Sequence, residues 1–128
     1  MCLSEIVSFT VPKNSRFYKC MRKEHGSYKG TCYGNEAMRI GEWYDAILTT
    51  PALYTLGFHC FLNKESAFNW APKDESLHYN YRVVEVELDN IHTTGYEDIE
   101  MTRAELKIFK HVRCVVASRM KIIREVGV

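Results

Sequence analysis

The sequence predicts an α+β fold, in which a mainly antiparallel sheet carries two helices packed on one face. Tyr81–Leu88 alternates between two faces, as a half-buried strand does. Arg16–Arg22 and Tyr28–Tyr33 flank a turn that contains glycine, which is typical of a β-hairpin. Lys64–Trp70 and the segment after Thr102 each follow a helix-start signal. These observations favour a sheet with two helices.

The composition describes one domain, residues 1–128. A chain of 128 residues suits a single core. With 46% apolar and 26% charged residues, it is neither a disordered tail nor a fibrous repeat. No apolar run approaches the roughly 18–20 residues of a membrane span. The first residues lack the features of a secretory signal, so we expect a cytoplasmic protein without a membrane partner.

The N-terminal half is expected to consist of strands and turns. Glu5–Val11 alternates loosely and ends before a proline, which predicts a short strand. Gly26 can adopt the positive φ that the hairpin turn needs. Arg39–Tyr44 is expected to be an edge segment. Asp45–Thr55 is expected to be a surface loop, because Pro51 cannot donate to a strand ladder.

A strand and a short helix follow. Leu56–Phe61 is aromatic and predicts a strand. Asn63 is a good N-cap, because its side-chain oxygen can accept from an amide of the first helical turn. The sequence therefore predicts a helix over Lys64–Trp70 that ends before Pro72.

The last third begins with the clearest strand, Tyr81–Leu88, which we expect to be central, with Val84 and Val86 buried. Asn90–Tyr96 is expected to be a loop.

A second helix is expected after this loop. Thr102 and Glu105 fit a capping box, in which threonine is the N-cap and glutamate the third helical residue. The segment Arg119–Val126 fits a last strand equally well, so residues 112–126 are left open between helix and strand. The helical spacing is carried by five residues: Ala104, Ile108, Val112, Val116 and Met120.

The five cysteines indicate reduced thiols. Their number is odd, and no C-x-x-C pair is present. A structural zinc site needs closely paired ligands, so we expect no metal, and no motif indicates a cofactor. Most of the cysteines lie in apolar stretches, which favours burial.

Charge is unevenly distributed, although the net charge is only +1. Residues 13–39 hold seven Lys/Arg, residues 85–101 hold six acids and no Lys or Arg, and residues 103–124 hold seven Lys/Arg. This pattern fits internal pairing, a head-to-tail oligomer, or a cationic pocket for an anion. The isoelectric point near 7.7 argues against binding of double-stranded nucleic acid.

Several side chains are candidates for an anion site. Lys19 and Arg22 lie on opposite faces of one strand, so only one of them points into a given pocket. Arg82 shares a strand face with Val84, where a guanidinium suits a phosphate or carboxylate partner. His59 is a candidate ligand contact or acid–base group, although a packed histidine is the commoner interpretation.

Aromatic and acidic residues add two further hypotheses. Trp43 and Trp70 are candidates for stacking on a base, with core packing as the commoner role for Trp70. Glu85 and Glu87 share a strand face and can divide acid and base roles, although such a pair is more often a solvated face.

The order of motifs resembles that of small uncharacterised phage proteins. The resemblance rests on Gly57-Phe58-His59, a short helix with Ala67-Phe68-Asn69-Trp70, and Val83-Val84-Glu85-Val86-Glu87. It covers roughly the last two-thirds of the chain and implies a phage accessory protein, which would act in the cytosol of the host cell.

The chain is also similar in element order to the phage Thoeris anti-defence sponges. The similarity rests on Tyr18-Lys19, Gly41-Glu42-Trp43, Phe58–Phe61, Ala67–Trp70 and Val83–Glu87. It implies a homo-oligomer that sequesters a cyclic ADP-ribose signal.

A weaker resemblance is to the ADP-ribosyltransferase fold, in which a strand, a short helix and a glutamate-bearing strand frame NAD. Glu85-Val86-Glu87 stands for its Glu-x-Glu motif, whereas Gly57-Phe58-His59 replaces its serine-containing strand. If the chain is an enzyme, this resemblance implies His59 and Glu87 as catalytic residues.

The leading hypothesis is a non-enzymatic protein that binds a small anionic, nucleotide-derived ligand. The alternatives are an ADP-ribosyltransferase-like enzyme acting on NAD and a protein-interaction module. The expected ligand-binding residues are Lys19, Arg22, His59, Trp70 and Arg82.

Overall fold

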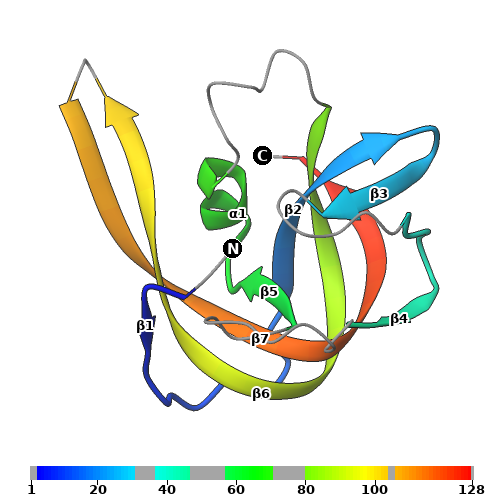
Figure 1. The fold of residues 1–128 in the computed structure, drawn as a ribbon, viewed down its shortest axis with the longest axis horizontal. Helices are drawn as coiled ribbons and strands as arrows, with labels where there is room; N and C mark the ends of the chain where they lie inside the picture. The colour runs from blue at the N-terminus through cyan, green and yellow to red at the C-terminus, as the bar shows by residue number, and fades with distance from the viewer. Residues whose placement is uncertain (1–2, 31–36, 47–56, 71–79, 104–105, 128) are drawn as a thin grey trace.

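The fold is dominated by strands. The computed structural model describes residues 3–30, 37–46, 57–70, 80–103 and 106–127 (Figure 1). Strands hold 66% of these residues, and the helix among them is α1 (Lys64–Trp70). The predicted α+β class with two helices on one face is therefore wrong. The described residues form a mostly antiparallel sheet with one short helix.

All the described strands belong to one sheet, in the order β1-β6-β2-β5-β7-β4, with β3 paired to β2. Every pairing is antiparallel. The strands are β1 (Glu5–Ile6), β2 (Phe17–Glu24), β3 (Ser27–Gly30), β4 (Trp43–Asp45), β5 (Phe58–Phe61), β6 (Tyr81–Arg103) and β7 (Leu106–Val126).

The sheet closes on itself. β6 pairs with both β2 and β7, β7 pairs with β5, and β5 returns to β2 through the single register pair Tyr18–Phe61. At this seam the Lys19 ammonium donates to the carbonyl oxygen of His59, at 2.9 Å. A side chain therefore continues the seam where the backbone ladder between β2 and β5 stops.

The main core lies on one face of this closed sheet. Val84 and Val86 are 0% and 2% exposed, which confirms their predicted burial. They pack against apolar residues from the other strands of the closed sheet, β2, β5 and β7, and from β3. The buried members of this cluster are Phe17, Met21, Tyr28, Met38, Phe58, Cys60, Val84, Val86, Val115, Met120 and Ile122.

α1 packs on the opposite face of the sheet, against β2 and β6, and buries a second cluster (Figure 1). Ala67 is fully buried there, and Trp70 packs against it as a half-buried residue. The Ser66 amide donates to Oδ1 of Asn63 at 2.7 Å, so the predicted N-cap and helix bounds are confirmed. Among the described residues, no helix has the length and apolar character needed to cross a membrane.

β6 and β7 form one long hairpin, where the sequence predicted a loop over Asn90–Tyr96 and a second helix after Thr102. The helix prediction failed because residues four apart share a face in a strand as well as in a helix. The predicted loop coincides with a bend: the register shifts between Ile91 and Thr93, and Asn90 has a φ of 57°.

The N-terminal predictions were correct in kind but not in length. β2 and β3 form the predicted hairpin, with positive φ at His25 and Gly26. β1 is shorter than the expected Glu5–Val11, and β4 pairs with β7 at the edge of the sheet. Most of the expected loop at Asp45–Thr55 lies outside the described residues.

Candidate functional site: a cationic cleft beside α1

A cleft of about 530 Å³ opens where α1 begins beside the outer face of β2, β6 and β7. Its size falls within the range of roughly 300–1,000 Å³ that is typical of small-molecule sites. It is lined by Arg16, Tyr18, Leu62, Asn63, Lys64, Glu65, Glu85, Arg124 and Val126.

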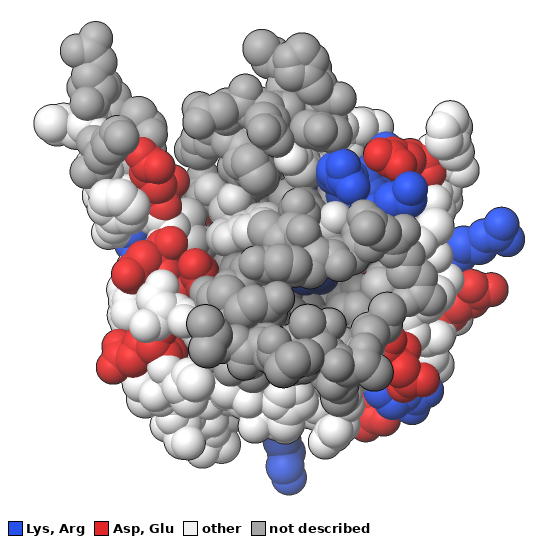
Figure 2. Space-filling view, in the orientation of Figure 1, with Lys and Arg blue, Asp and Glu red and all other residues white. Residues whose placement is uncertain are grey.

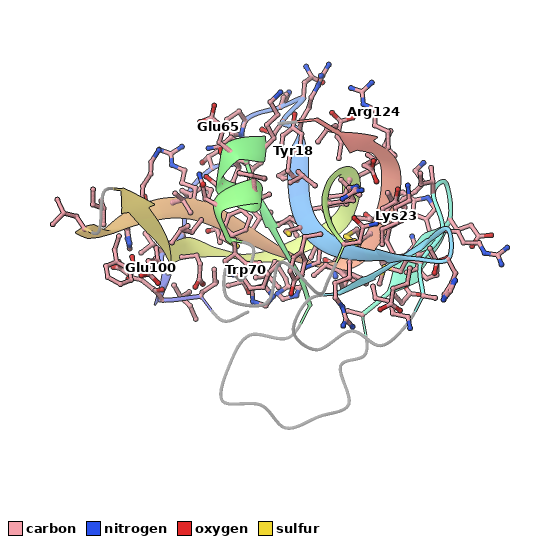
Figure 3. The ribbon with its side chains drawn as sticks, turned by 90° about the horizontal axis from the view of Figure 1, so that it is seen from above. Tyr18, Lys23, Glu65, Trp70, Glu100 and Arg124 are labelled. Carbon is pink, nitrogen blue, oxygen red and sulfur yellow. The ribbon has the colours of Figure 1, made fainter. Side chains whose placement is uncertain are left out.

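The strand register builds the wall of this cleft. Tyr18 on β2 lies opposite Glu85 on β6, and Glu85 lies opposite Arg124 on β7. Directly opposed residues on antiparallel strands project to the same face, so the three side chains form one row. Figure 3 shows Tyr18 along the upper edge of the molecule, with Glu65 of α1 on one side and Arg124 on the other.

Two arginines converge on one buried carboxylate. The side chain of Glu85 is 8% exposed, and its Oε1 accepts from Nη2 of Arg124 at 3.3 Å. Nη1 of Arg16 lies 3.8 Å from the same oxygen. The arginine side chains are themselves 58% and 68% exposed. Each guanidinium carries five N–H donors, so both have donors left for a ligand.

The cleft is cationic overall. Arg16, Lys64 and Arg124 line it together with two carboxylates, of which Glu85 is already engaged by the arginines. The ring of Tyr18 supplies an aromatic surface beside these charges. The arrangement suits an anion that also has a flat apolar part.

Glu85 and Glu87 do not act as a carboxylate pair. Glu87 is 53% exposed and forms its own ion pair with Lys121, at 3.1 Å. Because each glutamate has separate cationic partners, the structure offers no shared site in which they divide acid and base roles.

Arg82 lies in a different cluster, centred on Glu125. Oε1 of Glu125 accepts from the Tyr28 hydroxyl at 3.1 Å and lies 3.5 Å from Nζ of Lys23 and 3.6 Å from Nε of Arg82. The carboxylate partner that the sequence suggested for Arg82 is therefore a residue of the same chain.

His59 is packed as a neutral residue. It is 5% exposed, and its Nδ1 lies 3.2 Å from the carbonyl oxygen of Gly57. Burial lowers the pKa of His59 to about 4, with a smaller contribution from the charge of Lys19. Among the described residues none hydrogen-bonds its Nε2. Lys19 and His59 are the two expected site residues that the structure brings into contact.

The remaining expected residues lie elsewhere on the sheet. Trp70 packs against the second cluster, and Arg22 is a half-buried residue opposite Lys29 and Tyr81. None of the five residues expected from the sequence is among those that line the cleft.

Sequence reasoning missed Arg16 and Arg124 as partners. Both belong to the basic blocks that the sequence shows, but 108 positions separate them. Only the register of β6 with β7, and the course of the chain into β2, bring them to one carboxylate.

Trp43 is already covered by cations. The Arg119 guanidinium lies 4.9 Å from the ring centroid and the Lys121 ammonium 5.1 Å from it. Arg119 also pairs with Asp45 and Asp89, at 3.0 and 3.1 Å. These cation–π contacts hold Trp43 against β7, where β4 pairs with it.

The three cysteines that the structure describes are buried, which disfavours the reactive thiolate form. Cys20, Cys60 and Cys114 are free and buried, as expected for reduced cysteines. Burial raises the pKa of Cys20 to about 12 and that of Cys60 to about 11. Cys2 and Cys32 lie outside the described residues. Within the part of the chain that the structure describes, no group of histidine, cysteine or acidic residues is arranged to hold a metal ion.

No protein-family model matches the chain, and comparison with curated proteins and with solved structures found no significant match. The resemblances to phage proteins, to Thoeris sponges and to ADP-ribosyltransferases therefore remain predictions from the sequence.

Proposed function

We propose that this chain is a non-enzymatic protein that binds and sequesters a small anionic, nucleotide-derived ligand, in the cleft beside α1. One observation carries the proposal: two exposed arginines, Arg16 and Arg124, converge on the buried Glu85 beside the ring of Tyr18. Guanidinium groups bind phosphate through paired hydrogen bonds, and an aromatic ring stacks on a base.

Glu85 supports this role by positioning the arginines. A long arginine side chain loses rotamer freedom when it binds a ligand, which costs roughly 0.5–1.5 kcal/mol. The contacts with Glu85 already restrict both guanidinium groups before a ligand arrives. Their exposed fractions leave the remaining donors accessible from solvent.

The ligand class follows from the resemblances in the sequence. A cyclic ADP-ribose-like immune signal carries phosphate and adenine, which match the arginines and the tyrosine ring of the cleft. In this proposal the protein acts as a phage anti-defence sponge in the cytoplasm of the host cell.

The enzyme alternative is less well supported by the geometry. An ADP-ribosyltransferase-like reaction on NAD would use His59 and Glu87. His59 is buried and neutral at the seam of the sheet, whereas Glu87 is an exposed residue paired with Lys121. Neither residue lines the cleft.

Calorimetric titration with ADP-ribose, NAD and cyclic nucleotides tests the proposal. We expect at least one of them to bind the parent protein, and Arg124→Ala to weaken that binding roughly ten- to a hundredfold, the value of a charge-assisted hydrogen bond. Arg124→Lys should recover only part of the affinity, because an ammonium cannot make the bidentate hydrogen bonds that a guanidinium makes to phosphate. NAD should be recovered intact after incubation with the protein.

Two control variants locate the site. Arg39→Ala removes an exposed arginine outside the cleft and should leave the affinity unchanged. Arg82→Ala tests the site that the sequence suggested. If Arg82→Ala weakens binding and Arg124→Ala does not, the ligand binds near Glu125 and the cleft is the wrong site. The absence of binding by every ligand, together with no nucleotide released from the purified protein by denaturant, would refute the proposed function.

A further inference from the structure

The far part of the β6/β7 hairpin stands away from the closed sheet as a two-stranded ribbon. We define the ribbon as residues 97–103 of β6 and 106–113 of β7. Residues 97–103 pair with 106–112, and Arg113 pairs with Tyr96. β1 pairs with β6 only at Gly95 and Tyr96, and β5 pairs with β7 only from Cys114 onward. Figure 1 shows the ribbon extending beyond the other elements.

No described strand pairs with the outer edges of the ribbon, and at the start of its β6 edge the Asp98 amide donates to Oγ of Ser4 at 3.1 Å. A two-stranded hairpin on its own is marginally stable in water, and an unpaired edge is a template for another strand. The closed part of the sheet avoids this problem, because its strands pair in a cycle. An added strand would therefore stabilise the ribbon, which the closed part of the sheet does not support.

Exposed apolar side chains mark the same region. Leu106, Ile108 and Phe109 are 66%, 45% and 64% exposed, although all lie within four positions of β7. Leu106 and Ile108 share one face of β7, and Phe109 projects from the other face, so this end of the strand exposes apolar side chains on both faces. Single exposed apolar residues are common on protein surfaces, but a group of them at one place marks an interaction site.

The two edges of the ribbon carry opposite charge. The β6 edge bears Asp98 and Glu100, both exposed, and the β7 edge bears the exposed Lys110 and Arg113. In Figure 2 acidic side chains gather on the side of the molecule where the hairpin projects. Two β6 edges, or two β7 edges, would bring like charges together, whereas a β6 edge complements a β7 edge.

We propose that the ribbon is a self-association surface, on which the β7 edge of one copy of this chain pairs with the β6 edge of a second copy. The pairing adds a strand at each edge and covers Leu106 and Phe109. The interface is heterologous, so successive copies form a ring if the rotation closes and a filament if it does not. The ribbon and the cleft beside α1 share no residue, so this surface is separate from the proposed ligand site.

Sedimentation velocity of the full chain over a range of protein concentrations tests the surface. We expect the parent protein to form assemblies that grow with concentration and weaken as salt screens the charged edges. Leu106→Thr with Phe109→Thr should raise the dissociation constant roughly tenfold or more, because apolar groups at the centre of an interface contribute most. Ile123→Thr is the matched control, since Ile123 is a 42% exposed residue of β7 outside the ribbon.

A charge exchange tests which edges meet. Asp98→Lys with Glu100→Lys makes both edges basic and should weaken association. Adding Lys110→Glu with Arg113→Glu reverses both edges and should restore part of it. Circular dichroism checks that each variant is folded. A folded parent that stays monomeric at every concentration would overturn the proposal, even if it bound lipid vesicles or another protein through the ribbon. Unchanged association of Asp98→Lys with Glu100→Lys would overturn the pairing of β6 with β7.

Discussion

Glu85 and Glu87 show how far two similar residues can diverge in a fold. In the sequence they are alternate glutamates of one strand. In the structure Glu85 is buried between Arg16 and Arg124, whereas Glu87 is exposed and paired with Lys121. Their difference comes from what lies across the strands and from α1, which the local sequence does not contain.

Replacing each glutamate measures this difference. Glu85→Ala leaves two guanidinium groups without their shared carboxylate, and we expect the free energy of unfolding to fall by about 1 kcal/mol, because both arginines are largely exposed. Glu87→Ala should change it by less than roughly 0.5 kcal/mol. Urea denaturation of both variants gives the comparison, and equal effects would contradict the burial of Glu85.

Two other residues link stability to pH with opposite signs. Burial raises the pKa of Glu97 from 4.5 to about 7, and no described residue hydrogen-bonds its Oε2. The folded state therefore binds the Glu97 proton more tightly than the unfolded state does. This contribution to the free energy of unfolding is fully present below pH 4.5 and is lost as the pH rises through about 7. His59 has a pKa lowered from 6.5 to about 4, so its burial costs stability as pH falls below 6.5.

Glu97→Gln isolates the first effect. We expect the variant to be more stable than the parent above pH 7, and the advantage to shrink as pH falls towards 4.5, where Glu97 of the folded parent is protonated. Urea denaturation across this range gives the measurement, with Glu87→Gln as an exposed control on the same strand. A constant difference between parent and variant at all pH values would show that Glu97 is solvated.

Among the elements, those with a local signal could be predicted from the sequence. Asn63 and the apolar residues after it specify α1, and Gly26 specifies the turn between β2 and β3. The first part of β7 was wrongly predicted as a helix and residues 112–126 were left open, because Ile108, Val112 and Val116 satisfy both periods. The β-branched residues of β7 are a signal in the sequence that favours a strand over a helix.

The cap of α1 is testable because the helix has only seven residues. Asn63→Ala removes the acceptor for the Ser66 amide, and we expect the free energy of unfolding to fall by about 1 kcal/mol. Asn63→Asp keeps an acceptor at the same position and should be close to the parent. Chemical denaturation distinguishes them, and equal loss in both variants would show that the side-chain cap is not what stabilises α1.

At the scale of the whole molecule, the closure of the sheet decides where the candidate site lies. The sequence indicated an anion site in which the N-terminal hairpin meets Arg82, but closure turns Arg82 towards Glu125 and brings Arg16 to Arg124. Such long-range pairing depends on register over the complete chain. It leaves no periodic signal in any one segment.

The closure also makes the middle of β6 essential. Val84 is fully buried between β2 and β7 within the main core. Val84→Asp would bury an unpaired charge, and we expect it to abolish the folded state. Ile123→Asp, at an exposed position of the neighbouring strand, should remain folded. Circular dichroism during heating tests both, and a Val84→Asp protein that melts with the parent would show that the strand is not central.

The most direct test of the proposed binding function is to map ligand contacts by NMR. Backbone amide shifts of the labelled protein are recorded while ADP-ribose or a cyclic nucleotide is added. We expect the largest saturable changes at Tyr18, Lys64, Glu85 and Arg124, around the cleft beside α1. Changes centred on Lys23, Arg82 and Glu125, or no saturable change with any of these nucleotides, would contradict the assignment of this cleft as an anion site.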